Sequence, residues 1–342
     1  MQVQMYLQNK LKSCSSYELT EDDKNFLAKE GIEAYIYRKL TSKKFRKYKM
    51  TDSSVAHTKA SIQKCVRANK PLSVFYPQGA YKLWHLPSTP EVDWSEFFTI
   101  AYVVSYIAPI VAAYKPGVDL KYFFHTFLMK VHGNLTEQEI QTYDTSFEKL
   151  LVEFRKYLPQ NVTITIVRDR DIYSWDEYRQ ELEEIKRTVE KEFLQWPKDK
   201  KESLAKTARL NIKWLGAEDW TKLSKKEQEE KMRLALLYED SVPRMKKLAN
   251  AVKSEGNILL FNKAGDNFIG IGTTKTSIVK YWVGYGVLEK REETFADRIL
   301  SPEQLHALEK TPHTTEAIHL IDLQNFKTID MYPALNFTQT RP

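Results

Sequence analysis

Short apolar runs predict buried strands that stand far apart along the chain. Residues 72–76 are apolar, aromatic and β-branched and lie between prolines, which is typical of a buried strand. Residues 118–124 form a similar run, and residues 162–167 alternate valine, isoleucine and threonine. Residues 257–262 make a fourth short strand by pattern, and residues 317–323 alternate like a final one. We therefore expect a sheet whose strands are joined by long connections.

Helical signals fill several of these connections. Asp93 and Glu96 open an apolar helix, where carboxylates suit the positive end of the helix dipole. Thr136 and Glu139 make a capping box ahead of an apolar stripe at three- and four-residue steps. Residues 174–254 read almost wholly as helix, with many Glu and Lys and few apolar positions, which is typical of a lid or cover.

The order of these elements indicates the fold class. Strand, loop, helix and strand within residues 72–124 make a βαβ unit. We expect an α/β fold: Rossmann-like, with a mostly parallel sheet flanked by helices and with a helical insertion. The core is assigned to residues 51–173 and 255–330, the insertion or lid to residues 174–254, and a basic helical segment to residues 1–50. Ligands of such sheets bind beyond the carboxyl ends of the strands, so we expect the site there.

The loop that follows the first strand carries the catalytic candidates. Lys82 and His85 lie in this loop, just upstream of Asp93 and Glu96. The two carboxylates are three residues apart, so a helix presents both on one face. One of them could act as a general base while the other orients it. The alternative is a helix start that gains only favourable dipole charges.

Two further stretches offer groups for binding an anion. A glycine-rich bend near the C-terminal end supplies hydroxyl groups and one positive charge. Its candidates are Thr273, Thr274, Lys275, Thr276 and Ser277. A helix that begins near Thr276 would favour a phosphate or carboxylate, although the spacing of a Walker loop is missing and a capped turn is the alternative. Arg168 and Asp169 end the strand at residues 162–167, either as anion-binding groups or within a surface salt-bridge lattice.

The charge balance leaves a nucleic-acid partner open. The formal net charge is +7, and a short basic cluster occupies residues 43–49. Such a cluster could contact phosphates, although 52 lysines and arginines are scattered among 45 acids along the whole chain. A nucleic-acid-binding or nucleic-acid-modifying protein is therefore one alternative.

Composition also bounds the compartment and the cofactors. The two cysteines, Cys14 and Cys65, have no Cys-x-x-Cys partner, which favours a reducing, cytoplasmic environment. Residues 97–114 carry no charge over about the length of a bilayer span, but Pro109 and three tyrosines favour a buried core helix and no membrane. The seven histidines lack metal-ligand spacing, so neither a metal nor another cofactor is expected.

Three short motifs in residues 76–118 resemble those of one enzyme family. They are Tyr76-Pro77 with Lys82, then Pro90 with Asp93 and Glu96, then Tyr114-Lys115-Pro116-Gly117-Val118. Over about residues 55–170 the chain resembles the isocyanide (isonitrile) synthases, which are related to the pyoverdine and dityrosine biosynthesis proteins. That family has a Phe-Pro-x-Lys-like turn, a Pro-Asp-x-x-Glu helix start and Tyr-x-Pro-Gly-Ala before the next strand. Two residues are inserted here after Pro90.

The resemblance implies a Rossmann-like fold and a transferase or lyase. Family members join the α-amine of an amino acid to a carbon from a pentulose phosphate and yield an isocyanide. Carried over to this chain, the resemblance places the amine near Asp93 or Glu96 and the sugar phosphate near Lys82 or Lys275. The expected partner is therefore a small anionic substrate that resembles an amino acid or a sugar phosphate.

The chain departs from the family pattern at two places. Phe124-His125-Thr126 stands where the family carries a Ser-Asp-Gly turn. Residues 258–262 lack the Arg and the His of the family's Arg-Leu-Ser-Ile-His-like strand. A catalytically silent relative is therefore a further alternative. The enzyme hypothesis requires the turn after the first strand and the threonine-rich bend to meet over one edge of the sheet.

Overall fold

The structure is a computed structural model of the 342-residue chain. It describes residues 3–78, 91–133, 135–210, 219–253, 256–261, 265–272, 284–290, 293–300, 304, 307–308, 315–320 and 323–330.

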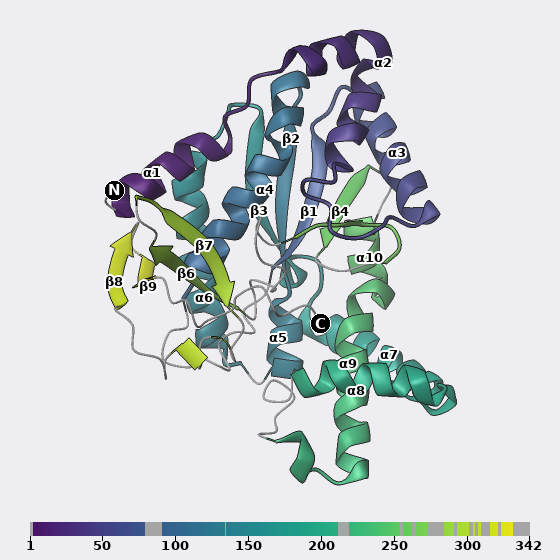
Figure 1. The fold of residues 1–342 in the computed structure, drawn as a ribbon. Helices are drawn as coiled ribbons and strands as arrows, with labels where there is room; N and C mark the ends of the chain where they lie inside the picture. The colour runs from purple at the N-terminus through teal and green to yellow at the C-terminus, as the bar shows by residue number, and fades with distance from the viewer. Residues whose placement is uncertain are drawn as a thin grey trace.

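A five-stranded parallel sheet lies at the centre of the molecule, in the order β3-β2-β1-β4-β5 (Figure 1). Its strands are β1 (Leu72–Gln78), β2 (Val118–Phe124), β3 (Val162–Arg168), β4 (Asn257–Phe261) and β5 (Ile269–Gly270). This is the strand order of doubly wound folds, which confirms the predicted Rossmann-like α/β class. The order reverses between β1 and β4, so the crevice in which such folds bind ligands lies beyond Gln78 and Phe261.

Helices cover both faces of this sheet. Figure 1 shows α4 (Trp94–Ala113) and α6 (Glu137–Arg155) on one face, and α3 (Asp52–Arg67) and α10 (Lys246–Lys253) on the other. Aromatic rings join the first pair of helices, since Phe97 of α4 lies 5.3 Å from Phe154 of α6 between ring centroids. The helix α4 is long and apolar enough to cross a membrane, but 83% of its most apolar window is buried inside the protein. The prediction of a buried core helix is confirmed.

The expected helical insertion follows β3. It contains α7 (Trp175–Gln195), α8 (Lys198–Leu210), α9 (Lys225–Arg244) and then α10. Both α7 and α8 pack against α9, and α9 also contacts α5 (Thr126–Gly133) beyond the end of β2. A bidentate ion pair joins α9 to α7. Both terminal nitrogens of Arg244 donate to the Glu192 carboxylate, at 2.8 and 2.7 Å.

Residues 285–330 build a second sheet that the sequence pattern did not reveal. Its strands are β6 (Tyr285–Lys290), β7 (Phe295–Leu300), β8 (Thr315–Leu320) and β9 (Leu323–Asp330), in the order β7-β6-β9-β8. The alternating residues expected to form a last strand of the core thus lie mainly in β8, which pairs antiparallel with β9. Period-two alternation identifies a strand but carries no information on which sheet it joins.

The N-terminal helices attach this second sheet and cover the core. The helix α1 (Val3–Cys14) reaches β7 through Tyr6, whose hydroxyl donates to Asp297 at 3.0 Å, while α2 (Glu21–Leu40) packs on α4 and α3. The basic cluster at residues 43–49 lies beside β5 at the edge of the sheet. Lys47 N–H donates a hydrogen bond to Gly270 C=O, in β5, at 2.9 Å. An antiparallel bridge between Arg46 and Ile271 strengthens this attachment. The backbone of the cluster is therefore anchored at the edge of the parallel sheet.

Candidate functional site

The first turn of α4 lies at the carboxyl edge of the parallel sheet, where the sequence predicted the site. Asp93 caps the helix: its Oδ1 accepts a hydrogen bond from Ser95 N–H at 2.6 Å. Glu96 returns the contact, because its Oε2 accepts from Asp93 N–H at 2.8 Å. This is a complete capping box, and it is buried, with Asp93 8% exposed and Glu96 0% exposed.

A buried hydrogen-bond chain continues from this capping box to the end of β1. Tyr143 on α6 donates its hydroxyl to Glu96 Oε1 at 2.6 Å, and Gln78 Nε2 donates to that hydroxyl at 3.0 Å. The Tyr143 ring stacks on Phe124, the last residue of β2, at 5.7 Å between centroids. The chain Gln78–Tyr143–Glu96 therefore ties the ends of two strands to the start of α4.

The second sheet meets the same helix start. Gly286 N–H on β6 donates to Asp93 Oδ1 at 3.2 Å. A Cβ atom at position 286 would lie 2.1 Å from Ser95 N, so only glycine allows this approach. Asp93 follows the loop after β1, and Gly286 follows the threonine-rich bend. The residues that follow the loop after β1 and the residues that follow the threonine-rich bend are thus in direct contact.

The predicted site residues that the structure describes fall into two groups. Asp93 and Glu96 lie together at the start of α4, while Arg168 and Asp169 lie at the end of β3. Lys82 and His85, with the cluster Thr273, Thr274, Lys275, Thr276 and Ser277, lie outside the described residues. Within the described part of the chain, no group of three or more His, Cys, Asp or Glu side chains is placed to hold a metal ion.

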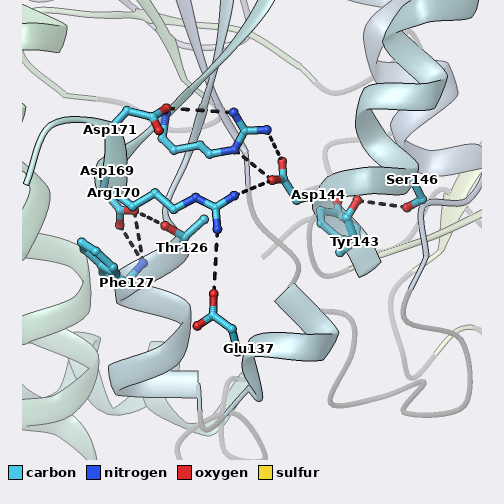
Figure 2. Close-up of polar contacts among 10 residues, drawn as sticks. Thr126, Phe127, Glu137, Tyr143, Asp144, Ser146, Asp169, Arg170 and Asp171 are labelled. Carbon is cyan, nitrogen blue, oxygen red and sulfur yellow. Dashed lines mark hydrogen bonds and ion pairs between the residues drawn. The ribbon is translucent and has the colours of Figure 1, made fainter. Parts of the chain in front are cut away.

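Arg168 belongs to an ion-pair network that adjoins Tyr143. Its Nε and Nη2 both donate to Asp144, at 2.8 Å each. Arg170 also donates to Asp144, at 3.0 Å, and lies 3.8 Å from Glu137, as Figure 2 shows. Two guanidinium groups thus share the buried Asp144 carboxylate, with a second acid close to Arg170. These ion pairs form a salt-bridge lattice, and an anion-binding role of Arg168 and Asp169 stays a prediction.

Asp169 holds the start of α5 in place. Its carboxylate accepts hydrogen bonds from the Thr126 hydroxyl and from Phe127 N–H, the latter at 3.0 Å to Oδ2 (Figure 2). The side chain is fully buried, and this burial raises the pKa of Asp169 to about 6 although the donors around it act in the opposite direction. The hydrogen-bond donors in the first turn of α5 therefore stabilise the charged form of this carboxylate, and burial disfavours it.

This raised pKa predicts a pH dependence of stability. The folded-state pKa of Asp169 is about 6 and its ordinary value is 3.8, so its contribution to stability is fully present below pH 3.8 and is lost as the pH rises through 6. A shift of this size corresponds to about 3 kcal/mol. We expect the free energy of unfolding of the wild type to fall by up to that amount, relative to Asp169→Asn, between acidic and neutral pH. Urea denaturation of both proteins across this range measures the difference, and a constant difference would contradict the expectation.

His125 is a polar group at this edge that the sequence marked only as a departure from the family pattern. It follows β2 directly, is 8% exposed, and packs its ring against Phe123 at 4.6 Å between centroids. Burial lowers the pKa of His125 to about 3, so the imidazole is neutral at physiological pH. Its Nδ1 has no hydrogen-bond partner among the residues that the structure describes.

Gln78 and Tyr143 were also missed by sequence reasoning. Tyr143 belongs to the apolar stripe predicted for its helix, and Gln78 lies two positions beyond the expected strand, which ends at Tyr76. Nothing local marks either side chain, because each becomes notable through a partner from another element. The capping pattern was the local signal that did point to this region.

One of three comparisons with known proteins supports the fold. No protein-family model matches the chain, and no curated protein matches it in sequence. Among solved structures, the crystal structure of the PvcA protein from Pseudomonas aeruginosa is similar, with a TM-score of 0.57 and 14% identity. The match covers 88% of this chain and 99% of PvcA. This chain shares the fold of PvcA. At this identity the likeness to PvcA shows the fold alone.

Proposed function

We propose that the protein is a small-molecule-modifying enzyme similar to the isocyanide synthases. Its substrate would be an anionic compound that resembles an amino acid or a sugar phosphate, bound beyond the carboxyl ends of the strands. The observation that carries the proposal is the fold match to PvcA over nearly the full length of both chains, which supports an isocyanide-synthase-like biosynthetic enzyme. The motif order in residues 76–118 points to the same family independently.

The contacts around α4 support a division of roles within this proposal. Both Glu96 oxygens already accept hydrogen bonds, so Glu96 would act by positioning Tyr143 and the end of β1. Asp93 would keep the start of α4 and β6 together on one side of the substrate. If either carboxylate acts as a general base, it must first release one of these donors. His125 is neutral, and its Nδ1 has no hydrogen-bond partner among the described residues, so it is a further group for binding the substrate.

Positive and hydroxyl groups complete the proposed site. Lys82 and His85 would come from the loop after β1, and Lys275 with Thr273, Thr274, Thr276 and Ser277 from the bend before β6. These groups suit a phosphate or a carboxylate, since they offer hydrogen-bond donors and positive charge. The direct contact between Asp93 and Gly286, which follow the two segments, supports their convergence.

A product assay tests the proposed function. The purified protein, incubated with each amino acid and a pentulose phosphate, is expected to form an isocyanide detectable by mass spectrometry. Lys82→Met is expected to lower turnover by about 100-fold or more, because it removes the charge proposed to hold the sugar phosphate. Lys29→Met, at an exposed position of α2, is the matched control and should retain full turnover. A folded protein that forms no product with any amino acid would contradict the proposal.

A further inference from the structure

A cavity of about 540 Å³ lies between α1, α4 and β7, lined by the outer face of α4. Figure 1 shows α1 and β7 on the same side of this helix. The cavity exists because α4 presents small side chains there: Ala101, Ser105 and Ala108 follow one another at helical spacing along one stripe. A volume of this size is typical of small-molecule sites, which span about 300–1,000 Å³. None of the residues of the buried chain Gln78–Tyr143–Glu96 lines it.

Six of the sixteen residues that line the cavity are aromatic. Tyr6 of α1 and Phe295 of β7 pack together at 5.6 Å between centroids. Phe45 and Tyr102 form a second pair at 5.2 Å, in an edge-to-face arrangement. Aromatic rings favour stacked or edge-to-face contact with another planar ring, so this lining suits a flat aromatic ligand better than a flexible chain.

The charged side chains that line the cavity are two lysines and one aspartate, and one of the lysines is paired with the aspartate. Lys10 is paired with Asp297 at 2.8 Å, and the Tyr6 hydroxyl donates to the same carboxylate. Although burial acts to raise it, the pKa of Asp297 is lowered because Lys10 and Tyr6 stabilise its charge. Lys44 also lines the cavity, with its ammonium 5.3 Å from the centroid of the Phe45 ring, and no ion pair involves it within the described part of the chain. Two lysines and one aspartate give a net charge of +1.

We propose that this cavity binds a small compound with a planar aromatic ring and a single carboxylate. The ring would lie against the aromatic pairs, above the small side chains of α4, and the carboxylate would face Lys44. The bound compound would touch α1, α4 and β7 together, so it would fasten the N-terminal helix and the second sheet to the core. This site is separate from the proposed active site and does not depend on the proposed function.

Calorimetric titration of the full chain with three probes tests the site. The probes are 2-naphthylacetate, its uncharged amide 2-naphthylacetamide, and hexanoate, which has the charge without the ring. We expect 2-naphthylacetate to bind with a dissociation constant of about 1 mM or below, given its size, and to raise the melting temperature. The amide and hexanoate should each bind more weakly, because each lacks one of the two recognised features.

Two substitutions assign the binding to this cavity. Ser105→Leu fills the space above α4 and should abolish binding, with the fold monitored by circular dichroism. Lys44→Gln should weaken binding of 2-naphthylacetate by up to about fivefold and leave binding of the amide unchanged, as expected for an exposed charge pair. Lys43→Gln, one residue away but not part of the lining, is the matched control and should bind normally. Absence of binding to the wild type, or unchanged binding to folded Ser105→Leu, would overturn the proposal.

Discussion

Replacing Gly286 with alanine is expected to destabilise the protein by about 2–5 kcal/mol. The new Cβ would lie 2.1 Å from Ser95 N and 2.3 Å from Trp94 C, both backbone atoms of the capped first turn of α4. Overpacking of this kind costs about 1–3 kcal/mol. Displacing β6 also breaks the hydrogen bond from Gly286 N–H to Asp93, worth about 0.5–1.5 kcal/mol or more because its acceptor is charged.

The location of the damage is as informative as its size. Hydrogen exchange should show β6 losing protection while β2, an inner strand of the parallel sheet, keeps it. Gly31→Ala provides the comparison, since its φ of +81° strains an alanine but no atom lies within 4 Å of the added Cβ. That variant should be destabilised with β6 still protected. If Gly286→Ala left the exchange of β6 unchanged, the close approach between β6 and α4 would be refuted.

The parallel sheet and its helices could be predicted because their signals are local. Residues 118–124 were expected as a strand and form β2 over the same residues. Asp93 and Glu96 were expected to open a helix, and they form its capping box. The strand is indicated by its apolar run, and the helix start by a capping residue with an acid three positions later. Each signal lies within a few neighbouring residues.

The second sheet could not be predicted in the same way, because its arrangement depends on contacts between distant segments. β6 pairs antiparallel with β7 but parallel with β9, which lies more than 30 residues further along the chain. Its position against α4 depends on the absence of a side chain at Gly286, and one glycine among 11 carries no mark of this role in the sequence.

The residues of the candidate site also divide into those marked by a local pattern and those that depend on contacts between distant segments. The carboxylates at the start of α4 were found from local pattern, whereas their partners Gln78 and Tyr143 come from a different strand and a different helix. The pairing of Arg168 with Asp144 spans 24 positions, and the pattern of alternating charges at the end of β3 left it open. Local chemistry therefore identified the edge of the sheet, and tertiary packing decided which groups there are already satisfied.

Replacing Glu96 with alanine is expected to lower the free energy of unfolding by about 3–5 kcal/mol. Within the part of the chain that the structure describes, three donors would lose their acceptor: Asp93 N–H, the Ser95 hydroxyl and the Tyr143 hydroxyl. Each buried donor left without a partner costs about 1–3 kcal/mol, and water does not reach a side chain that is 0% exposed to replace the carboxylate. Urea denaturation followed by two spectroscopic probes measures the loss.

A second capping box in the same protein provides the matched control. Glu139 accepts from Thr136 N–H at 2.7 Å in the same geometry as Glu96, but at an exposed helix start where water can take its place. Glu139→Ala should therefore cost only about 1 kcal/mol. Tyr143→Phe should cost about 1–2 kcal/mol in the wild type and much less in Glu96→Ala, because its hydroxyl has then already lost its acceptor. Equal losses for Glu96→Ala and Glu139→Ala, or additive effects of Glu96 and Tyr143, would mean that the buried chain does not hold α4 against the sheet.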